Sequence, residues 1–314
     1  MHWKLGEFKR SVAHARSFAR RVYPVAVDQT TVASRHVRID RLRLHYLEAG
    51  VGPPVLLLHG WPTSSWLWRN VMPHLATRHR VIAVDLPGFG RSDKPLGVTY
   101  DLPFYTPLID RFLDALGIAT TGLVVHDLGG PIGLHWACHH TDRLDRLVLL
   151  NTLVYPRPSW ATIAFVLACR TPGLRSLLAT PWMLAATMRI GVADSRRLGD
   201  DVVRCVQAPF EHRDARRALL KAGAELTPRG MIEIARWFPS LRVPVRVIYG
   251  TRDRILPDIE RTVRGVARDL PHAEVTALPD CGHFLQEERP QQLGELLAAF
   301  FGAPRRDSKS DDSG

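Results

Sequence analysis

A series of short, uninterrupted apolar segments limits most strongly what this chain can fold into. Residues 55–58 read VLLL, residues 81–84 read VIAV and residues 147–150 read LVLL. Strands that are buried on both faces have such sequences, because neither face meets water. Segments with helical spacing separate these runs, and that alternation is typical of a sheet covered by helices on both faces. We therefore predict an α/β fold with a mostly parallel sheet.

Five further segments have strand character. Residues 37–39 and 42–47 alternate apolar with polar side chains, as a hairpin at the edge of a sheet does. Residues 124–125, 243–249 and 274–278 continue the alternation of strand and helix. Together with the three buried runs, these segments predict an eight-stranded sheet.

The strand signal disappears between residues 151 and 239. This stretch reads as helices interrupted by TPGLRS, TPWML and LTPRG, and it is far longer than an ordinary connection between strands. We interpret it as a helical cap inserted over one edge of the sheet. The predicted organisation is a basic N-terminal extension (1–35), a core in two parts (36–151 and 241–302), the helical cap (152–240) and a disordered polar tail (303–314).

The net charge of +11 is unevenly distributed, which argues against nucleic-acid binding. Residues 1–21 carry six Lys and Arg against one Glu and so hold +5 of the total. No nucleic-acid recognition motif is visible in the rest of the chain. Residues 1–22 are predicted to form a basic amphipathic helix, which either contacts an anionic membrane surface or docks on its own domain.

The sequence also allows a prediction of where in the cell the protein is located. Residues 1–21 lack the continuous apolar region and the cleavage site of a secretory signal. No stretch approaches the roughly 18 uninterrupted apolar residues that a membrane span needs. The four cysteines are scattered without a CxxC pair, so neither a disulfide framework nor a zinc site is indicated. We expect a cytoplasmic protein whose membrane contact, if any, is peripheral; the oligomeric state stays open.

The turn in VVHDLGGPIGLHWA, residues 124–137, has the most unusual chemistry in the sequence. A strand runs directly into a helix there, and Asp127 lies between them. A serine nucleophile needs a base to remove its proton, whereas a carboxylate is ionised at neutral pH and can displace a leaving group from saturated carbon. The helix that begins at Gly129 directs its first amides toward Asp127 and favours the anion.

Two more polar side chains are expected near this turn. Asp253 follows a predicted strand in YGTRD, and His283 precedes the last helix in DCGHFLQEERP. Ligands bind beyond the carboxyl ends of the strands in such sheets, so these segments should converge with Asp127. The chain order is then nucleophile, acid and base.

This order resembles the α/β-hydrolase superfamily from about residue 36 to 302, as do the stretches HGWPTSSWLWRNVMPHL, DLPGFGRSDKP and HDLGGPIGLHWA. An Asp at this turn is similar to the branch that contains haloalkane dehalogenases and epoxide hydrolases. The resemblance implies an alkyl ester on Asp127, hydrolysed by a water that His283 activates while Asp253 orients the imidazole. It also implies a small hydrophobic substrate, water as the second reactant, and no cofactor.

The same resemblance gives roles to residues near the nucleophile. The backbone amides of Trp61 and Leu128 are expected to bind the oxyanion that forms on the Asp127 carboxyl group. Small or loop-shaping residues should support this arrangement: His59, Gly60, Gly129 and Gly130.

The leaving group is the point at which the sequence departs from these families. Haloalkane dehalogenases usually have Trp after the nucleophile, where its indole N–H binds the halide, but Leu128 has no donor. Trp61 and Trp160 are candidate replacements, unless they only form an aromatic wall. Epoxide hydrolases protonate the opening ring with cap tyrosines, and residues 152–240 contain only Tyr155. A haloalkane dehalogenase-like hydrolase is favoured, with an epoxide hydrolase as the alternative and a non-catalytic ligand-binding protein as a third interpretation.

Four histidines remain beside the turn. His126 is expected to pack or hydrogen-bond there rather than to titrate. His135, His139 and His140 lie on the following helix, and the sequence offers them no convincing ligand partner. Because a metal site needs several converging ligands, no metal site is predicted.

Overall fold

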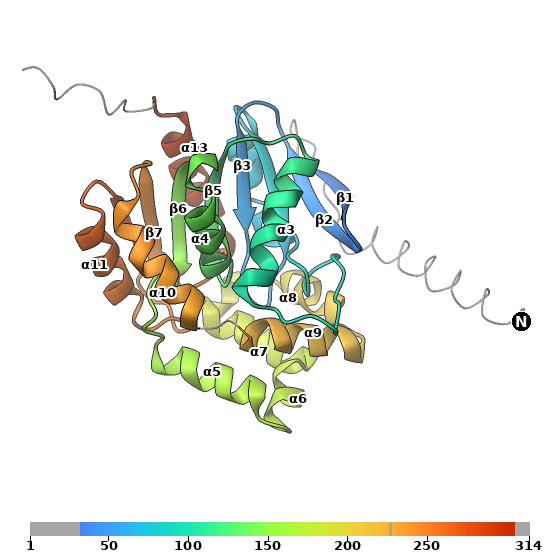
Figure 1. Ribbon diagram of the computed structural model, residues 1–314. Helices are drawn as coiled ribbons and strands as arrows, with labels where there is room; N and C mark the ends of the chain where they lie inside the picture. The colour runs from blue at the N-terminus through green and yellow to red at the C-terminus, as the bar shows by residue number, and fades with distance from the viewer. Residues whose placement is uncertain (1–31, 226–227, 305–314) are drawn as a thin grey trace, which may run out of the picture.

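The computed structural model describes residues 32–225 and 228–304, which form one eight-stranded sheet with helices around it (Figure 1). The strand order is β1-β2-β4-β3-β5-β6-β7-β8. The β1–β2 and β2–β4 pairs are antiparallel, and the other neighbours are parallel. The strands are β1 Ala33–Ile39, β2 Leu42–Ala49, β3 Pro54–Leu58, β4 Arg80–Val84, β5 Thr121–Asp127, β6 Leu144–Thr152, β7 Val245–Gly250 and β8 Glu274–Leu278. The predicted α/β fold with a mostly parallel, eight-stranded sheet is confirmed.

The central strands are buried on both faces, which is why their sequences are continuously apolar. In β3, Leu56 and Leu58 belong to one hydrophobic cluster, and Val55 and Leu57 belong to another. Side chains alternate across a strand, so each apolar run supplies both cores at once.

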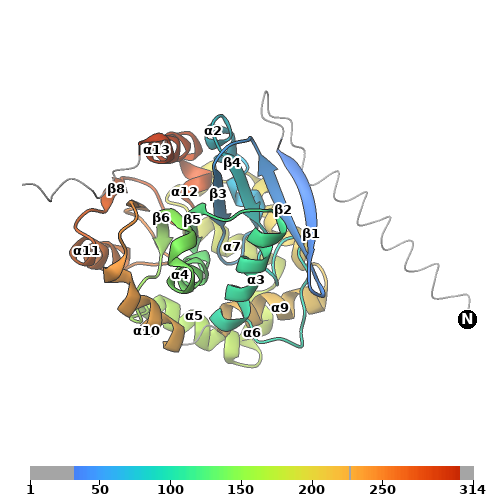
Figure 2. The same cartoon turned by 45° about the horizontal axis from the view of Figure 1, so that its top comes forward.

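The helices divide between the two faces and the cap. One cluster lies under α3, α4, α10 and α11, and the other lies under α2, α12 and α13 (Figure 2). The helices of the core are α2 Met72–Ala76, α3 Leu102–Ala115, α4 Gly129–His139, α10 Pro228–Trp237, α11 Ile259–Asp269, α12 Leu285–Glu288 and α13 Pro290–Gly302. Short 3-10 helices span Ser65–Trp68 (η1), Thr141–Arg143 (η2), Ser195–Arg197 (η3), Ala208–Phe210 (η4) and Phe238–Ser240 (η5).

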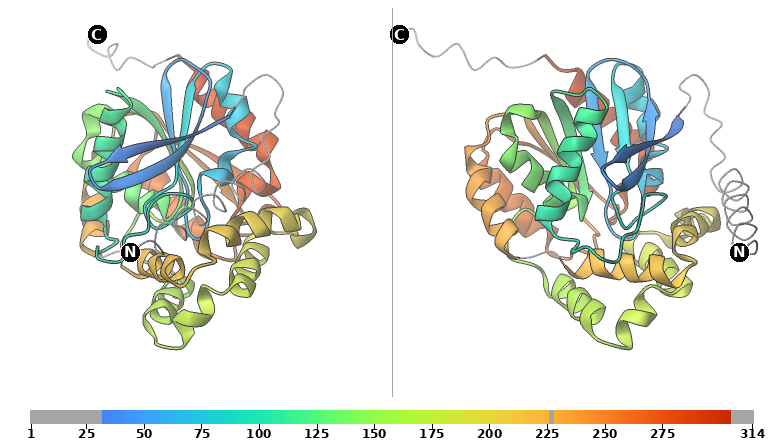
Figure 3. Two further views of the ribbon diagram at one scale, coloured as in Figure 1. Left: turned by 90° about the vertical axis from the view of Figure 1, so that its right-hand side faces the viewer. Right: turned by 45° about the vertical axis from the view of Figure 1, so that its right-hand side comes forward.

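The segment between β6 and β7 covers the carboxyl ends of the parallel strands. Its first five helices form a separate layer below the sheet in Figure 1, and Figure 3 shows this layer from two other sides. They are α5 Trp160–Arg170, α6 Leu174–Leu178, α7 Pro181–Gly191, α8 Asp200–Gln207 and α9 Arg213–Ala224. The last helix of the segment, α10, packs instead against α4 of the core.

The predicted amphipathic helix at residues 1–22 lies outside the described residues, as does most of the predicted tail. Within the described ranges, none of the helices has both the length and the apolar character needed to cross a bilayer.

Candidate active site

Asp127 lies at a strained turn between β5 and α4. Its backbone has φ +48°, in the left-handed region that side chains other than glycine rarely adopt. The Thr152 hydroxyl donates to the Asp127 carbonyl oxygen at 2.6 Å and so holds the turn from β6. A Cβ at Gly130 would overlap the Thr152 side chain, and one at Gly129 would lie 2.6 Å from the carbonyl oxygen of His59. Only glycine allows this close approach of helix and strands.

The Asp127 carboxylate is held from two sides. The backbone N–H of Trp61 donates to Oδ1 at 2.7 Å, and Nε2 of His283 lies 3.4 Å from Oδ2. A Cβ at Gly60 would overlap the Asp127 side chain, so glycine is what lets the Trp61 amide reach it. Burial raises the pKa of Asp127, but His283 and the Leu128 amide outweigh it and hold this pKa below its usual value. Asp127 is therefore an anion at neutral pH.

His283 is fully buried and lies between two carboxylates. Its Nδ1–H donates to Oδ2 of Asp253 at 2.8 Å, while its Nε2 faces Asp127. Burial lowers the pKa of His283, but Asp253 and Asp127 outweigh it and raise this pKa to about 10. The imidazole is consequently protonated as long as both carboxylates are ionised.

Asp253 is fixed on the loop after β7. Its Oδ1 accepts hydrogen bonds of 2.8 Å from the backbone amides of Ile255 and Leu256. Its Oδ2 accepts from His283 and, at 2.6 Å, from the side-chain amide of Asn151. Burial raises the pKa of Asp253, but these partners lower it below its usual range. The structure thus brings Asp127, Asp253 and His283 together: His283 is hydrogen-bonded to Asp253, and its Nε2 lies 3.4 Å from the Asp127 carboxylate.

Asn151 was not predicted as a site residue. Besides donating to Asp253, its side-chain oxygen accepts from the Gly250 amide at 2.9 Å, so it ties β6 to β7 beneath the acid. A polar amide at the end of a buried strand was the available signal in the sequence.

Two buried histidines support the site without titrating near neutral pH. His126 donates through Nε2 to the carbonyl oxygen of His283 at 2.9 Å, and burial together with His283 lowers its pKa to about 3. His59 accepts the Leu86 amide at Nε2, so its Nδ1 carries the proton and donates to the Gly60 carbonyl. Burial also lowers the pKa of His59. His59 thus shapes the loop that carries the Trp61 amide.

Three predicted leaving-group contacts are wrong. The Trp61 indole N–H donates to the Leu219 carbonyl of α9 at 3.3 Å, and the ring packs on Phe165, so it forms part of the apolar wall. Trp160 is 76% exposed at the start of α5, so its ring lies largely in solvent rather than in a buried site. Tyr155 donates its hydroxyl to Asp269 at 2.8 Å, and burial together with this carboxylate raises the pKa of Tyr155 above its usual value.

Comparison with known proteins gives consistent results. Residues 53–172 match a family model for the alpha/beta hydrolase fold. Haloalkane dehalogenase 2 of Mycobacterium bovis is 30% identical over 280 residues, which cover 86% of this chain and 95% of that protein. A soluble epoxide hydrolase of Corynebacterium sp. is 28% identical over 304 residues, covering 88% and 99% respectively. The crystal structure of haloalkane dehalogenase DbeA from Bradyrhizobium elkani has a TM-score of 0.78 at 25% identity, with 87% and 98% coverage.

Proposed function

Because the chain belongs to the α/β-hydrolase family and is similar to haloalkane dehalogenases, we propose that it hydrolyses a carbon–halogen bond in a small apolar substrate. The observation that carries this proposal is the ionised Asp127 carboxylate, held between the Trp61 amide and His283. An anion in this position can attack saturated carbon without a base to activate it.

In the first step, Oδ2 of Asp127 attacks the carbon that bears the halogen. The new C–O bond forms as the halide leaves with the electron pair of the old bond. Oδ1 keeps its hydrogen bond from the Trp61 amide throughout and becomes the carbonyl oxygen of the ester. The product of this step is an alkyl ester of Asp127.

Formation of the ester also prepares His283 for the second step. The ester is neutral, so one of the two charges that raise the pKa of His283 disappears. The imidazole can then lose its proton and accept one from water, which attacks Cγ of Asp127. The Trp61 amide stabilises the oxyanion on Oδ1. The alcohol leaves with a proton from His283, and the new carboxylic acid of Asp127 gives its proton back to the imidazole, which restores the carboxylate and the protonated His283. The one proton released to solvent per turnover is the one that His283 lost before water attacked.

Epoxide hydrolysis is the second candidate, favoured by the similarity to a soluble epoxide hydrolase. The same attack by Asp127 would open the ring, but the ring oxygen then needs a proton. In the described part of the cap the single tyrosine, Tyr155, donates to Asp269 and is not placed to supply it. A non-catalytic binding role accounts less well for a complete set of Asp127, Asp253 and His283.

A panel of alkyl halides and epoxides separates these candidates. Carbon–halogen hydrolysis releases free halide with an alcohol, whereas epoxide hydrolysis yields a diol with no halide. Halide release that disappears in Asp127→Ala would support the proposal. A folded wild-type protein that forms neither product across the panel would contradict both candidates.

The leaving group gives a separate prediction. Leu128→Trp is expected to increase the rate of halide release, because an indole N–H beside the nucleophile can stabilise the departing anion. In a dry site one such donor is worth roughly 3 kcal/mol, or about a hundredfold in rate. The measurement is single-turnover halide release.

Two controls accompany this substitution. Leu128→Phe adds a ring without a donor, and an equal rate increase in that variant would assign the effect to shape. Trp61→Phe should leave halide release nearly unchanged, because the Trp61 N–H is directed to the Leu219 carbonyl.

A further inference from the structure

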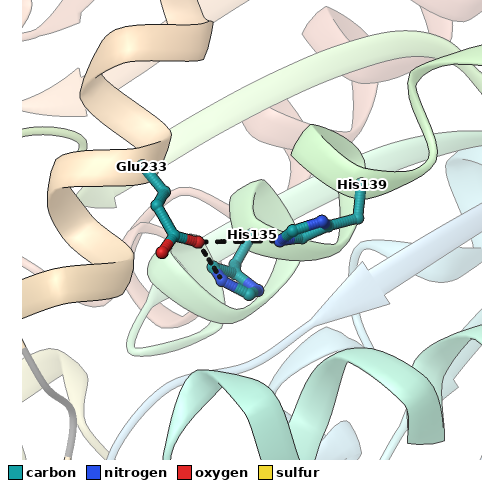
Figure 4. A group of neighbouring side chains, drawn as sticks. All are labelled: His135, His139 and Glu233. Carbon is teal, nitrogen blue, oxygen red and sulfur yellow. Dashed lines mark hydrogen bonds and ion pairs between the residues drawn. The ribbon is translucent and has the colours of Figure 1, made fainter.

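Three metal-ligating side chains meet on the side of the core formed by α4 and α10. His135 and His139 lie one turn apart on α4, and Glu233 faces them from α10 (Figure 4). Nε2 of His135 is 3.3 Å from Oε2 of Glu233, and Nε2 of His139 is 3.8 Å from the same oxygen. The three possible ligand atoms, one from each of these side chains, all lie within 4.8 Å of one another.

These separations fit a tetrahedral ion. Zinc binds nitrogen and oxygen at about 2.0–2.1 Å, so the edges of a tetrahedral site measure roughly 3.3–3.4 Å. Of the three edges, the one between His135 and Glu233 has this length, the one between His139 and Glu233 measures 3.8 Å, and the one between the two histidines is within 4.8 Å. A rotation of the half-exposed His139 ring can shorten the last two. The fourth position faces solvent, because His139 and Glu233 are both partly exposed.

The surroundings also suit His135 as a ligand. The ring is buried, and its Nδ1 hydrogen-bonds with the Thr106 hydroxyl at 2.7 Å. Without an ion, Nε2–H donates to Oε2 of Glu233 and Nδ1 accepts from the Thr106 hydroxyl. When an ion binds, the proton moves to Nδ1, which then donates to Thr106 and frees the Nε2 lone pair for the metal. Arg229 lies 3.4 Å from the other Glu233 oxygen, Oε1.

We propose that His135, His139 and Glu233 bind a divalent transition-metal ion, with Zn²⁺ as the first choice. Two imidazoles and one carboxylate suit Zn²⁺, Co²⁺ or Ni²⁺, whereas Mg²⁺ and Ca²⁺ require mostly oxygen ligands. The ion joins α4, which follows the nucleophile turn, to α10, which leads into β7. It therefore has a structural role, separate from the reaction at Asp127.

Titration of the metal-free full-length protein with Co²⁺ and Zn²⁺ tests this site. We expect one equivalent of Co²⁺ with the visible absorption of a tetrahedral N/O site, and displacement by Zn²⁺. Zn²⁺ at a hundred times its Kd should raise Tm by about 5 °C. His139→Gln and Glu233→Gln change partly exposed side chains and should each weaken binding at least about a hundredfold.

His140→Gln is the matched control. His140 directly follows α4 and contacts Asp110 at 3.3 Å, so its substitution should leave Co²⁺ binding intact. Absence of saturable binding in the wild type would overturn the proposal. So would binding that survives either His139→Gln or Glu233→Gln, because the ion would then be held elsewhere.

An independent observation concerns the outer surface of the cap. Of the large apolar side chains that are exposed in the described residues, most lie on α5, α6 and α7. We call this set the cap apolar face: Trp160, Ile163, Leu167, Leu174, Leu177, Trp182 and Ile190. The two tryptophans are 76% and 68% exposed. Figures 1 and 3 show α5 and α6 at the outer edge of the cap, away from the sheet.

The spacing and the charges of this face are unusual for a surface open to water. Trp160, Ile163 and Leu167 follow one side of α5, which points outward rather than into a core. Residues 153–193 contain four arginines but no Asp, Glu or Lys. Exposed large apolar side chains gathered on neighbouring helices, with arginines in the same segment, are typical of an interaction site.

We infer that the cap apolar face docks on an anionic lipid bilayer. Tryptophan is favoured at the boundary between lipid and water, and arginines beside it are attracted to anionic headgroups. The segment itself carries no carboxylate, and of its four arginines Arg189 pairs with Asp200 of α8. Docking here would place the cap of the proposed active site next to the phase in which apolar substrates dissolve.

Sedimentation with vesicles tests this surface on the full-length protein. We expect binding to phosphatidylcholine vesicles with 30% phosphatidylglycerol, and weaker binding to phosphatidylcholine alone or at high salt. Trp160→Ser with Trp182→Ser should lower binding at least about tenfold. The matched control is Val51→Ser, an exposed apolar residue outside the cap, which should bind like the wild type.

A second measurement locates the contact, because the basic N-terminal residues could also bind anionic lipid. Brominated lipids should quench tryptophan fluorescence, and Trp160→Phe with Trp182→Phe should remove most of that quenching while binding persists. Quenching or vesicle binding that neither double variant changes would overturn the inference. A dimer that Trp160→Ser with Trp182→Ser dissociates, without vesicle binding, would instead assign this face to a second copy of the chain.

Discussion

Substitution of His283 by Ala is expected to stop the reaction at the covalent ester. Asp127 keeps its hydrogen bond from the Trp61 amide and can still attack the substrate, but no base remains to activate water. Turnover should fall at least about ten-thousandfold. Intact-mass spectrometry should show protein carrying the added mass of the alkyl group, and peptide mapping should place it on Asp127.

Two controls make this result specific. Asp127→Asn should stay unmodified, since its amide is a poor nucleophile. His272→Ala removes an exposed histidine outside the site and should turn over normally. If His283→Ala loses activity but remains unmodified by a substrate that the wild type consumes, the two-step scheme is wrong. His283→Gln retains more of the buried volume if the alanine variant does not fold.

Asp253→Asn is expected to have the second-largest effect. One oxygen of the Asp253 carboxylate accepts from both the His283 imidazole and the Asn151 side-chain amide. If the side-chain nitrogen of an asparagine faces these two donors, it can accept a hydrogen bond from neither. The imidazole then loses its orientation and the charge that stabilises its protonated form. Ester hydrolysis should slow by about ten-thousandfold, while formation of the ester changes little.

The pH dependence of ester hydrolysis distinguishes the orienting role of Asp253 from a general loss of structure in the variant. Hydrolysis of the ester needs neutral His283, so its rate falls as pH drops through the imidazole pKa in the ester form. Asp253 raises the pKa of His283, so Asp253→Asn should move this acid limb to lower pH as well as lowering the plateau. Asp258→Asn is the control, because Asp258 pairs with Arg261 at the start of α11. A normal plateau in Asp253→Asn would assign the acid role to another residue.

Much of the fold could be read from the sequence because its signals are local. VLLL, VIAV and LVLL became β3, β4 and β6, since an apolar run of that length is stable only between two cores. The turn at Asp127 was equally local, because the strand, the acid and the two glycines are consecutive. The convergence of Asp253 and His283 followed from the rule that loops at the carboxyl ends of parallel strands share one edge.

The predictions that failed depended on contacts between distant segments. The donors of Trp61 and Tyr155 were correctly identified as hydrogen-bonding groups, but their acceptors are Leu219, 158 residues away, and Asp269, 114 residues away. Burial forces a polar group to pair with whatever acceptor the packing brings near, and the sequence does not specify that neighbour. Trp160 differs in that its side chain is 76% exposed at the start of α5, and the sequence does not specify which side of a cap helix faces solvent.

By itself, then, the sequence determined the sheet, the long helical segment between β6 and β7, and the chain order of Asp127, Asp253 and His283, because strand periodicity and turn chemistry are encoded in neighbouring residues. Only the tertiary structure decided which donors remain available to a substrate and which histidines acquire a ligand partner. His135 and His139 lacked a partner in the sequence, and the packing of α10 on α4 supplied Glu233 from 98 and 94 residues away. Such pairs form when whole helices dock, so their chemistry is a property of packing rather than of any local segment.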